Sequence, residues 1–399
     1  MARFRRRPGD PAVAVEHQLG LFERLGYLAQ RAEAPCPTHP ATKLFCLVAA
    51  MMGLGLLLQA SHAATAIVDP AEFRAEVFQQ SVFRVLGVGV MLIAYRLGPR
   101  GIRPVLPALV VLSVFLLLAC WIPGLANSRN AASRWVTLPL VGISIQPSEV
   151  ARIFLAVWVA DRCTRLGPLL SDMRRGTLPI LGVGLGVFLL IVLEPDLGGG
   201  LVFLAVFLMT WYVGGATFAQ FSGTGLVLGS AALLTAMTSL DYVRGRLANF
   251  FGDSQNDQVD ASLHALGSGD LLGVGLGQGG WRTAGMPYQD SDYVFSLLGE
   301  ELGFLGLALA VGMVLAFLWF ALRLVISIRD RFSALAAFGL LVGVAMQGMI
   351  HMQVVTGLAP PKGMSFPFLS DGGTSLLVSA LAVGLALGAA RGAEEASGT

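Results

Sequence analysis

The chain has 399 residues, of which 55% are hydrophobic and only 13% are charged, and its mean hydropathy is +0.71. This is more apolar surface than a soluble domain of that length can bury, so the composition excludes an ordinary soluble protein and indicates a membrane protein. The formal net charge is only +2, which gives no indication of a nucleic-acid partner.

The four cysteines and the N-terminus add little chemistry. Cys36, Cys46, Cys120 and Cys163 lack the paired spacing of a zinc site or a disulfide framework, and we interpret them as inert thiols. The first ten residues, "MARFRRRPGD", are basic, but no short apolar core follows directly, so we do not expect a cleavable signal peptide.

Runs of about 20 apolar residues are long enough to cross a bilayer as helices. The sequence predicts ten such segments, and therefore an all-α polytopic membrane protein. They fall near residues 43–67, 77–95, 105–123, 147–161, 177–193, 197–213, 217–239, 293–322, 333–357 and 372–390.

Most Lys and Arg residues fall on the connections that share the N-terminal side of this arrangement. The positive-inside rule then predicts that both termini are cytoplasmic. We expect a basic cytoplasmic segment over 1–42, a transmembrane domain over 43–391 and a short cytoplasmic tail over 392–399.

The connection 240–292, on the predicted outer side, is much longer than the others, and loops of this length are usually functional or disordered. Its stretch "QVDASLHALGSGDLLGVGLGQGG" predicts a short helix at the membrane surface. The glycines of "LGVGLGQGG" do not follow a strand, so they are not a dinucleotide-binding signature.

Four carboxylates stand at the end of this loop and in the helix that follows. Asp290 and Asp292 lie where water meets the bilayer, a position that suits a general base acting on a lipid-linked substrate. The alternative is that they only favour the N-terminus of the next helix, where the macrodipole stabilises negative charge. Glu300 and Glu301 lie further along and need a partner inside the bundle.

Other charged residues are candidates for supporting roles. Arg152 and Glu149 share a helix face and are possible partners of the two glutamates, as an interhelical clamp or as part of a catalytic group. In "LEPDLGGG", Glu194 and Asp196 follow a helix break and either cap a helix or line a cavity.

Several cations fall on or near the predicted outer face. Guanidinium groups bind phosphate oxygens in bidentate geometry, so a ring of such residues would hold a pyrophosphate, although some of them must be ordinary interface anchors. The members are Arg134, Arg152, Arg244, Arg246, Arg282 and Lys362.

Five motifs, in the same order, resemble those of the SEDS family (FtsW, RodA and SpoVE), and the resemblance runs from the first predicted span to the last. They are "NAASRWVTLPLVGISIQPSEVAR", "LEPDLGGGLVF", "SLHALGSGDLLGVGLGQGG", "MPYQDSDYVFSLLGEELGFLG" and "PPKGMSFPFLSDGGTSLL". Arg152 stands in place of the family's Lys, and Gly199 in place of its Thr.

The resemblance implies an inner-membrane glycosyltransferase with ten spans that polymerises lipid II into glycan strands. It also implies a class B penicillin-binding protein as partner, with other division or elongation proteins. The family's essential aspartate falls on Asp292. The sequence "PPKGM" favours a division role of the FtsW type.

Four positions depart from the family pattern near these motifs. Asp290 occupies a His position, Tyr288 a Glu position, His351 an Asn position and Asp371 a Tyr position. The key acid, Asp292, remains, but the changes at His351 and Asp371 leave altered substrate handling, a divergent paralogue and lost activity as alternatives.

We expect Asp292 to accept the proton of an acceptor hydroxyl while the pyrophosphate leaves, with charge stabilised by arginines or by a divalent cation such as Mg²⁺. The alternative functions are a lipid II flippase and an inactive scaffold that recruits a transpeptidase.

Overall fold

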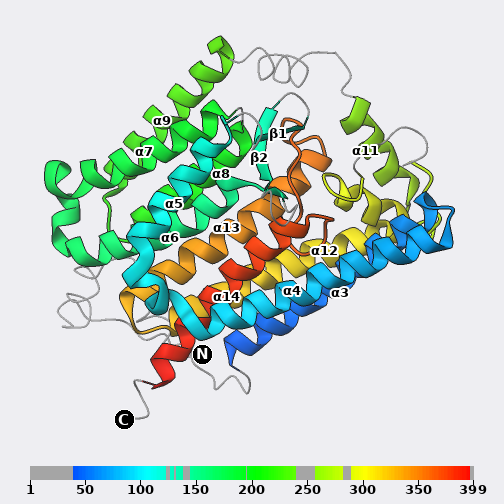
Figure 1. Cartoon of the computed structure of the whole chain (residues 1–399), viewed down its shortest axis with the longest axis horizontal. Coiled ribbons are helices and arrows are strands. Elements are labelled where there is room, and N and C mark those ends of the chain that lie inside the picture. The colour runs from blue at the N-terminus through cyan, green and yellow to red at the C-terminus, as the bar shows by residue number, and fades with distance from the viewer. Residues whose placement is uncertain are drawn as a thin grey trace, which may run out of the picture.

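A computed structural model describes residues 39–122, 126–129, 132–137, 144–194, 196–239, 257–281 and 289–395. These form a bundle of long helices (Figure 1). The α-helices are α3 (Pro40–Ala66), α4 (Pro70–Ile102), α5 (Leu106–Ala119), α6 (Pro147–Leu166), α7 (Leu178–Leu193), α8 (Leu197–Val213), α9 (Phe218–Ser239), α11 (Asp257–Ser268), α12 (Val294–Ser327), α13 (Arg331–Val355) and α14 (Gly373–Glu395).

The predicted helical class is confirmed. Each of the ten predicted apolar segments coincides with one of these helices, and α11 is the short helix predicted in the loop 240–292. Within the described part, six stretches are long and apolar enough to cross a membrane. The number of crossings and their orientation stay predictions, and the segment 1–38 and residues 396–399 lie outside the described residues.

The all-α prediction did not include a small antiparallel sheet in the connection that precedes α6. Its strands, in the order β1-β2-β3, are β1 (Ala126–Arg129), β2 (Ala132–Thr137) and β3 (Ser144–Ile145). Val136 is the register partner of Ala126 on one side and of Ile145 on the other. The strands are too short for a strong alternating pattern in the sequence. The hydroxyl of Thr374, at the start of α14, donates to the carbonyl of Ser144 at 2.8 Å and so ties the sheet to the bundle.

Aspartates at the helix starts explain several boundaries. The carboxylates of Asp69, Asp196 and Asp330 accept hydrogen bonds from backbone N–H groups in the first turns of α4, α8 and α13. A carboxylate at this position satisfies a donor that the helix itself leaves unpaired. These caps fix where each chain segment enters the bundle.

Helix α13 lies at the centre and contacts α6, α8, α12 and α14. Helix α14 also packs closely along α4 (Figure 1). A Cβ added at Gly384 would lie 2.4 Å from the Met91 carbonyl oxygen, and one added at Gly388 would lie 2.4 Å from that of Tyr95. Small residues four apart allow such close backbone approach, as in other membrane helix pairs.

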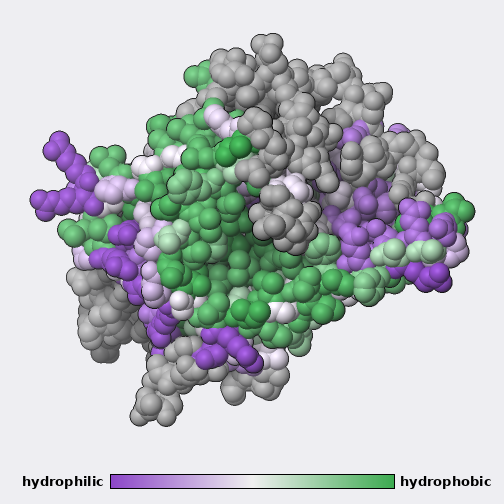
Figure 2. Space-filling view, in the orientation of Figure 1, coloured by the Kyte–Doolittle hydropathy of each residue, from purple (hydrophilic) through white to green (hydrophobic). Residues whose placement is uncertain are grey.

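The surface has the pattern of a protein embedded in lipid. Figure 2 shows a broad hydrophobic belt, with hydrophilic residues gathered toward its two ends. Large apolar side chains are exposed in the described part of the chain, including Phe115 (64%), Leu226 (72%) and Phe304 (60%). Exposure of this extent is unfavourable in water and favourable in hydrocarbon. The protein is therefore a multi-pass membrane protein.

Candidate active site

Residues 356–372, which we call the α13–α14 connection, bring the predicted site residues together. This segment follows α13 and leads into α14. Lys362 lies beside Asp196, Gly363 lies against Asp292, and Ser370 bonds the backbone of the segment that carries Asp292. Motifs far apart in the sequence therefore meet on one short stretch of chain.

The position of Asp292 is set by hydrogen bonds to the carbonyl groups of the two residues that precede it. The carbonyl of Asp290 accepts hydrogen bonds from the Gln59 side chain and from the backbone N–H of Asp371, each at 2.9 Å. The carbonyl of Ser291 accepts one from the Ser370 hydroxyl at 2.6 Å. These bonds hold residues 290–292 at the end of the bundle where α12 begins.

The Asp292 carboxylate itself is half-buried and lies against Gly363. A Cβ added at Gly363 would lie only 2.5 Å from Asp292 Oδ2. The N-cap residue of α12 is Tyr293, whose side chain makes no capping hydrogen bond. Asp292 therefore lies in a formed contact with the α13–α14 connection, and neither aspartate is the N-cap residue of α12.

Asp196 is the N-cap of α8, as the capping alternative predicted. Its Oδ1 accepts from the Gly199 N–H at 3.0 Å, and its Oδ2 accepts from Gln146 Nε2 at 2.8 Å and from the Ser148 hydroxyl at 3.0 Å. Lys362 Nζ lies 3.7 Å from Asp196 Oδ1, and only 1% of the Asp196 side chain is exposed. This buried carboxylate joins the starts of α6 and α8 to the α13–α14 connection.

The side chain of Lys362 runs over Gly198, where an added Cβ would overlap it. Glycine at that position therefore leaves room for the lysine. Glu194 is the C-cap residue of α7 and is buried beside Cys120. The described cysteines Cys46, Cys120 and Cys163 are free thiols.

Glu149 and Arg152 are joined through Gln347 of α13. The Arg152 guanidinium donates to Gln347 Oε1 at 2.6 Å, and Gln347 Nε2 donates to Glu149 at 3.4 Å. The Ser375 hydroxyl also donates to Glu149, at 2.8 Å. Gln347 Nε2 additionally bonds Ser365 of the α13–α14 connection. This network, which we call the Gln347 cluster, supports the connection from inside the bundle.

Glu300 and Glu301 form a separate cluster at the other side of the site. Glu300 accepts from the backbone N–H of Gly280 at 2.6 Å and from the Gln289 side chain at 2.9 Å. Glu301 accepts from the Ser61 hydroxyl at 2.6 Å and from the Gly277 N–H at 3.2 Å. The two glutamates thus hold the glycine-rich end of the long loop against α3 and α12.

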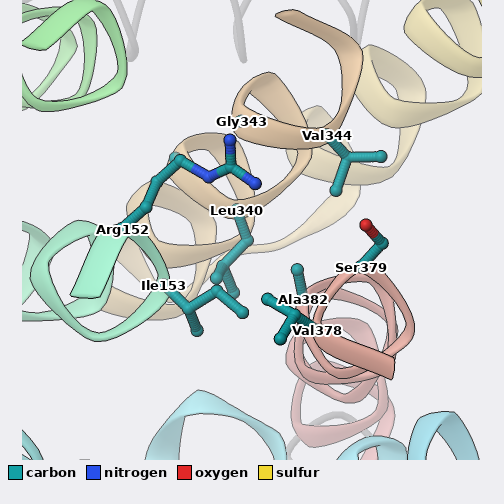
Figure 3. Close-up of a pocket in the computed structure, with 9 residues that line it drawn as sticks. Arg152, Ile153, Leu340, Gly343, Val344, Val378, Ser379 and Ala382 are labelled. Atoms are coloured by element: carbon teal, nitrogen blue, oxygen red, sulfur yellow. The ribbon is translucent and has the colours of Figure 1, made fainter. Parts of the chain in front are cut away.

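The structure corrects the interpretation that Arg152 is the partner of these glutamates. Arg152 is bound in the Gln347 cluster, and its guanidinium points into the space between α6, α13 and α14 together with the Ser379 hydroxyl (Figure 3). The other lining residues shown there are aliphatic or glycine. Arg152 is 8% exposed, so it is a buried residue of the bundle and not part of an outer ring of cations.

The other members of the predicted cation ring are mostly beyond what the structure describes. Arg244, Arg246 and Arg282, like Tyr288, lie outside the described residues, and so does the side chain of Arg134. Their roles in substrate binding stay predictions. Lys362 is the ring member that the structure places at the site.

Three of the departures from the family pattern have identifiable partners. His351 Nδ1 lies 2.6 Å from the Met364 carbonyl oxygen, so this residue holds the α13–α14 connection. Burial raises the pKa of Asp371, and the nearby Asp290 and Glu76 raise it further, against a hydrogen bond from Gln80 and the charge of Arg84. His62 Nδ1 lies 3.8 Å from Asp290 Oδ2.

The sequence interpretation missed several neutral residues of the site. Gln347, Ser365 and Ser375 connect Glu149 to the α13–α14 connection, and Ser61 and Gln59 contribute from α3. Gln347 was detectable, because an amide side chain in an apolar helix usually has a partner inside the bundle. The serines carry no such signal.

The structure and the comparisons identify the class and the family in turn. The fold and site define a polytopic helical membrane protein with an acidic site at one end of its bundle. A family model described as cell cycle protein (FtsW/RodA/SpoVE) matches residues 41–395. The chain belongs to this family.

Among curated relatives, stage V sporulation protein E of Bacillus subtilis is 31% identical and covers 89% of this chain and 98% of its own length. A probable peptidoglycan glycosyltransferase FtsW of Trichlorobacter lovleyi is 30% identical, with coverages of 88% and 92%. The solved structure of RodA from Thermus thermophilus has a TM-score of 0.62 at 25% identity, covering 88% of this chain and 96% of its own.

A chain in a solved peptidoglycan synthase complex, described as coordinating polymerization and crosslinking, has a TM-score of 0.70 at 24% identity. It covers 88% of this chain and 97% of its own length. This likeness supports the fold.

Proposed function

We propose that this protein is a peptidoglycan glycosyltransferase that polymerises lipid II at the outer face of the cytoplasmic membrane, in cell division or cell-shape maintenance. The observation that carries the proposal is the contact of Asp292 with Gly363, next to the Lys362–Asp196 pair. An acid and a cation are thus neighbours at one end of the bundle. The names of curated FtsW relatives give the reaction class.

In the proposed reaction, the 4-hydroxyl oxygen of an acceptor sugar attacks the anomeric carbon of a lipid-linked donor. The bond from that carbon to the pyrophosphate oxygen breaks, undecaprenyl pyrophosphate leaves with its electron pair, and the anomeric centre inverts. Asp292 takes the hydroxyl proton, a general-base contribution of about 10² to 10⁴ in rate. We assign to Lys362, which directly precedes Gly363 in the chain, the role of offsetting negative charge on the leaving group.

A divalent cation such as Mg²⁺ was a further expectation. Within the described residues there is no group of three or more His, Cys, Asp or Glu side chains arranged to hold a metal ion. The described residues thus do not form such a site, and no step above is assigned to a metal.

The partner in this proposal is a class B penicillin-binding protein transpeptidase, which would crosslink the strands. Support comes from the likeness to a chain of a peptidoglycan synthase complex.

The test is polymerisation of purified lipid II by the purified protein, alone and with its candidate transpeptidase. We expect glycan strands from the parental protein and almost none from Asp292→Asn, with equal folded yield. Strand formation by Asp292→Asn at the parental rate would refute the assignment. Transport of fluorescent lipid II across vesicles without any strand formation would favour a flippase, and recruitment of the transpeptidase without either activity would favour a scaffold.

A further inference from the structure

Helix α12 is broken near its start, and the long loop fills the break. Gly303 has φ of +63°, which ends the regular helical hydrogen bonding there. The N–H groups of Phe304 and Leu305 donate instead to the carbonyls of Asp270 and Leu271, at 2.9 and 3.3 Å. In return, the N–H groups of Val274 and Gly275 donate to the carbonyls of Glu300 and Glu301, at 2.9 and 3.1 Å.

Residues 269–280, which we call the glycine loop, have further backbone donors with partners inside the protein. The Gly273 N–H donates to the Gly269 carbonyl at 2.7 Å, and the Gln278 N–H to the Gly275 carbonyl at 3.1 Å. The N–H groups of Gly277 and Gly280 donate to Ser61 and Glu300. These backbone groups are paired within the protein and do not depend on water for their hydrogen bonds, which lowers the free-energy cost of bringing this part of the loop toward lipid.

Glycine is required at the closest of these contacts. Gly273 has φ of +83°, and a Cβ added to it would lie 2.1 Å from the Glu301 carbonyl oxygen. A Cβ added at Gly269 would lie 1.9 Å from the Gly299 carbonyl oxygen. The backbone of the loop is thus packed directly onto that of α12.

Whereas the backbone of the glycine loop is packed against the protein, several of its side chains are apolar and exposed. Leu271 is 60% exposed, Leu272 72%, Val274 44% and Leu276 43%. The sequence 271–280 contains no charged residue. A patch of this kind is unfavourable in water and marks a surface that another phase or molecule covers.

The exposed apolar patch of the glycine loop is continuous with the exposed apolar side of α12, and this indicates which medium covers the patch. Directly after the break, α12 exposes Phe304 at 60%, Leu305 at 54% and Leu309 at 46%. The Leu305 N–H is bonded to the Leu271 carbonyl, so the leucines of the loop begin where the exposed apolar face of the membrane helix begins. The same medium that covers this face of α12 therefore reaches the loop.

We propose that residues 271–276 are immersed in the headgroup–acyl boundary of the lipid leaflet on the side of Asp292. Amphipathic segments at such a boundary typically bury their apolar side chains about 5–10 Å deep. Glu300 binds both the loop and Gln289, which lies three residues before Asp292. Immersion of the loop would thus set the height of the site relative to the lipid headgroups. The proposal does not depend on the reaction that the site performs.

The test uses a fluorescent NBD label on single cysteines in the full chain, with the four native cysteines replaced by alanine and the protein in phosphatidylcholine–phosphatidylglycerol vesicles. Leu272→Cys reports the loop. Glu72→Cys, an exposed position in the first turn of α4, is the aqueous control, and Leu309→Cys is the lipid control.

We expect the label at position 272 to show a blue-shifted emission, quenching by lipids with a shallow doxyl group, and loss of quenching by iodide relative to position 72. Iodide quenching equal to that at position 72, without doxyl quenching, would overturn the proposal and leave this patch free for a protein partner or a second copy of the chain.

A second measurement needs no substitution, in case the cysteine-free chain does not fold. The parental protein is reconstituted with a phospholipid that carries a photoactivatable diazirine near the top of its acyl chain. We expect lipid adducts on the peptide that contains residues 271–276 and on the peptide that contains Phe304 and Leu305. Adducts on the second peptide without any on the first would contradict immersion of the loop.

Discussion

Replacement of Gly363 by alanine tests the central contact of the proposed active site. The added Cβ would lie 2.5 Å from Asp292 Oδ2, whereas ordinary van der Waals contact begins near 3.4 Å. The carboxylate then has to retreat by about 0.9 Å. Misplacement of a reacting group by about 1 Å can cost about 10²-fold in rate, which corresponds to about 2.7 kcal/mol of activation free energy.

The folded state should tolerate the same change. The nearest atoms belong to a side chain that can rotate, and Gly363 does not have the left-handed backbone that would exclude alanine. Replacing glycine where alanine fits the backbone usually stabilises by about 0.4–1 kcal/mol, which would offset part of any strain. Gly363→Ala should therefore keep the parental unfolding temperature to within a few degrees while losing activity.

The assay is the initial rate of strand formation from lipid II, measured together with thermal unfolding. Gly53→Ala is the matched control, because no side chain or other segment of the chain lies within 4 Å of a Cβ added there. A parental rate for Gly363→Ala, with Asp292→Asn inactive, would show that catalysis does not depend on this position of the carboxylate. A large loss of stability would instead show that the segment tolerates no added volume.

Three further predictions concern folding. Gly55→Ala should lower the unfolding temperature far more than Gly53→Ala, because its added Cβ would meet the Phe368 carbonyl oxygen at 2.4 Å. Gln347→Leu should lower the free energy of unfolding by more than about 2 kcal/mol and reduce folded yield, because it removes the hydrogen-bond partner that Gln347 provides to the buried Arg152 and Glu149. Gln353→Leu, at an exposed position of the same helix, is the control. Equal folded yields of the two variants would contradict this role of Gln347. Hydrogen bonds from Ser333 and Arg100 hold the pKa of Asp330 below its ordinary value despite partial burial. As an N-cap, the ionised Asp330 carboxylate should stabilise the folded state by about 1 kcal/mol. This stabilisation should be present above about pH 4, the ordinary pKa of an aspartate, and should be lost as the pH falls through the lower pKa of Asp330 in the folded state. Unfolding scans of Asp330→Ala and the parental protein should therefore converge at low pH, and a constant difference would refute this.

Much of the fold could be predicted because its signals are local. An apolar run long enough to span a bilayer is visible in the sequence wherever it occurs, and each predicted segment coincides with a helix. Asp196 was predictable as a cap because it directly precedes its helix. The order of the motifs was sufficient for the family, which the match over residues 41–395 confirms.

The partners of the buried polar residues could not be predicted. Arg152 and Gln347 are 195 residues apart in the chain, and Ser61 and Glu301 are 240 apart. Helical periodicity says which face a residue shares with its neighbours, but not which other helix lies opposite. For this reason the sequence suggested Arg152 as a partner of Glu300 and Glu301. In the structure, Arg152 instead hydrogen-bonds Gln347, and the two glutamates accept hydrogen bonds from the glycine loop.

The amino-acid sequence alone was therefore enough for the membrane class, the helices and the family, since hydrophobicity and motif order lie along the chain. Only the tertiary structure decided that the α13–α14 connection gathers the motifs and that the long loop completes the broken helix α12. The first depends on side-chain and main-chain contacts between distant segments and the second on main-chain hydrogen bonds, and no local pattern in the sequence records which distant segments meet.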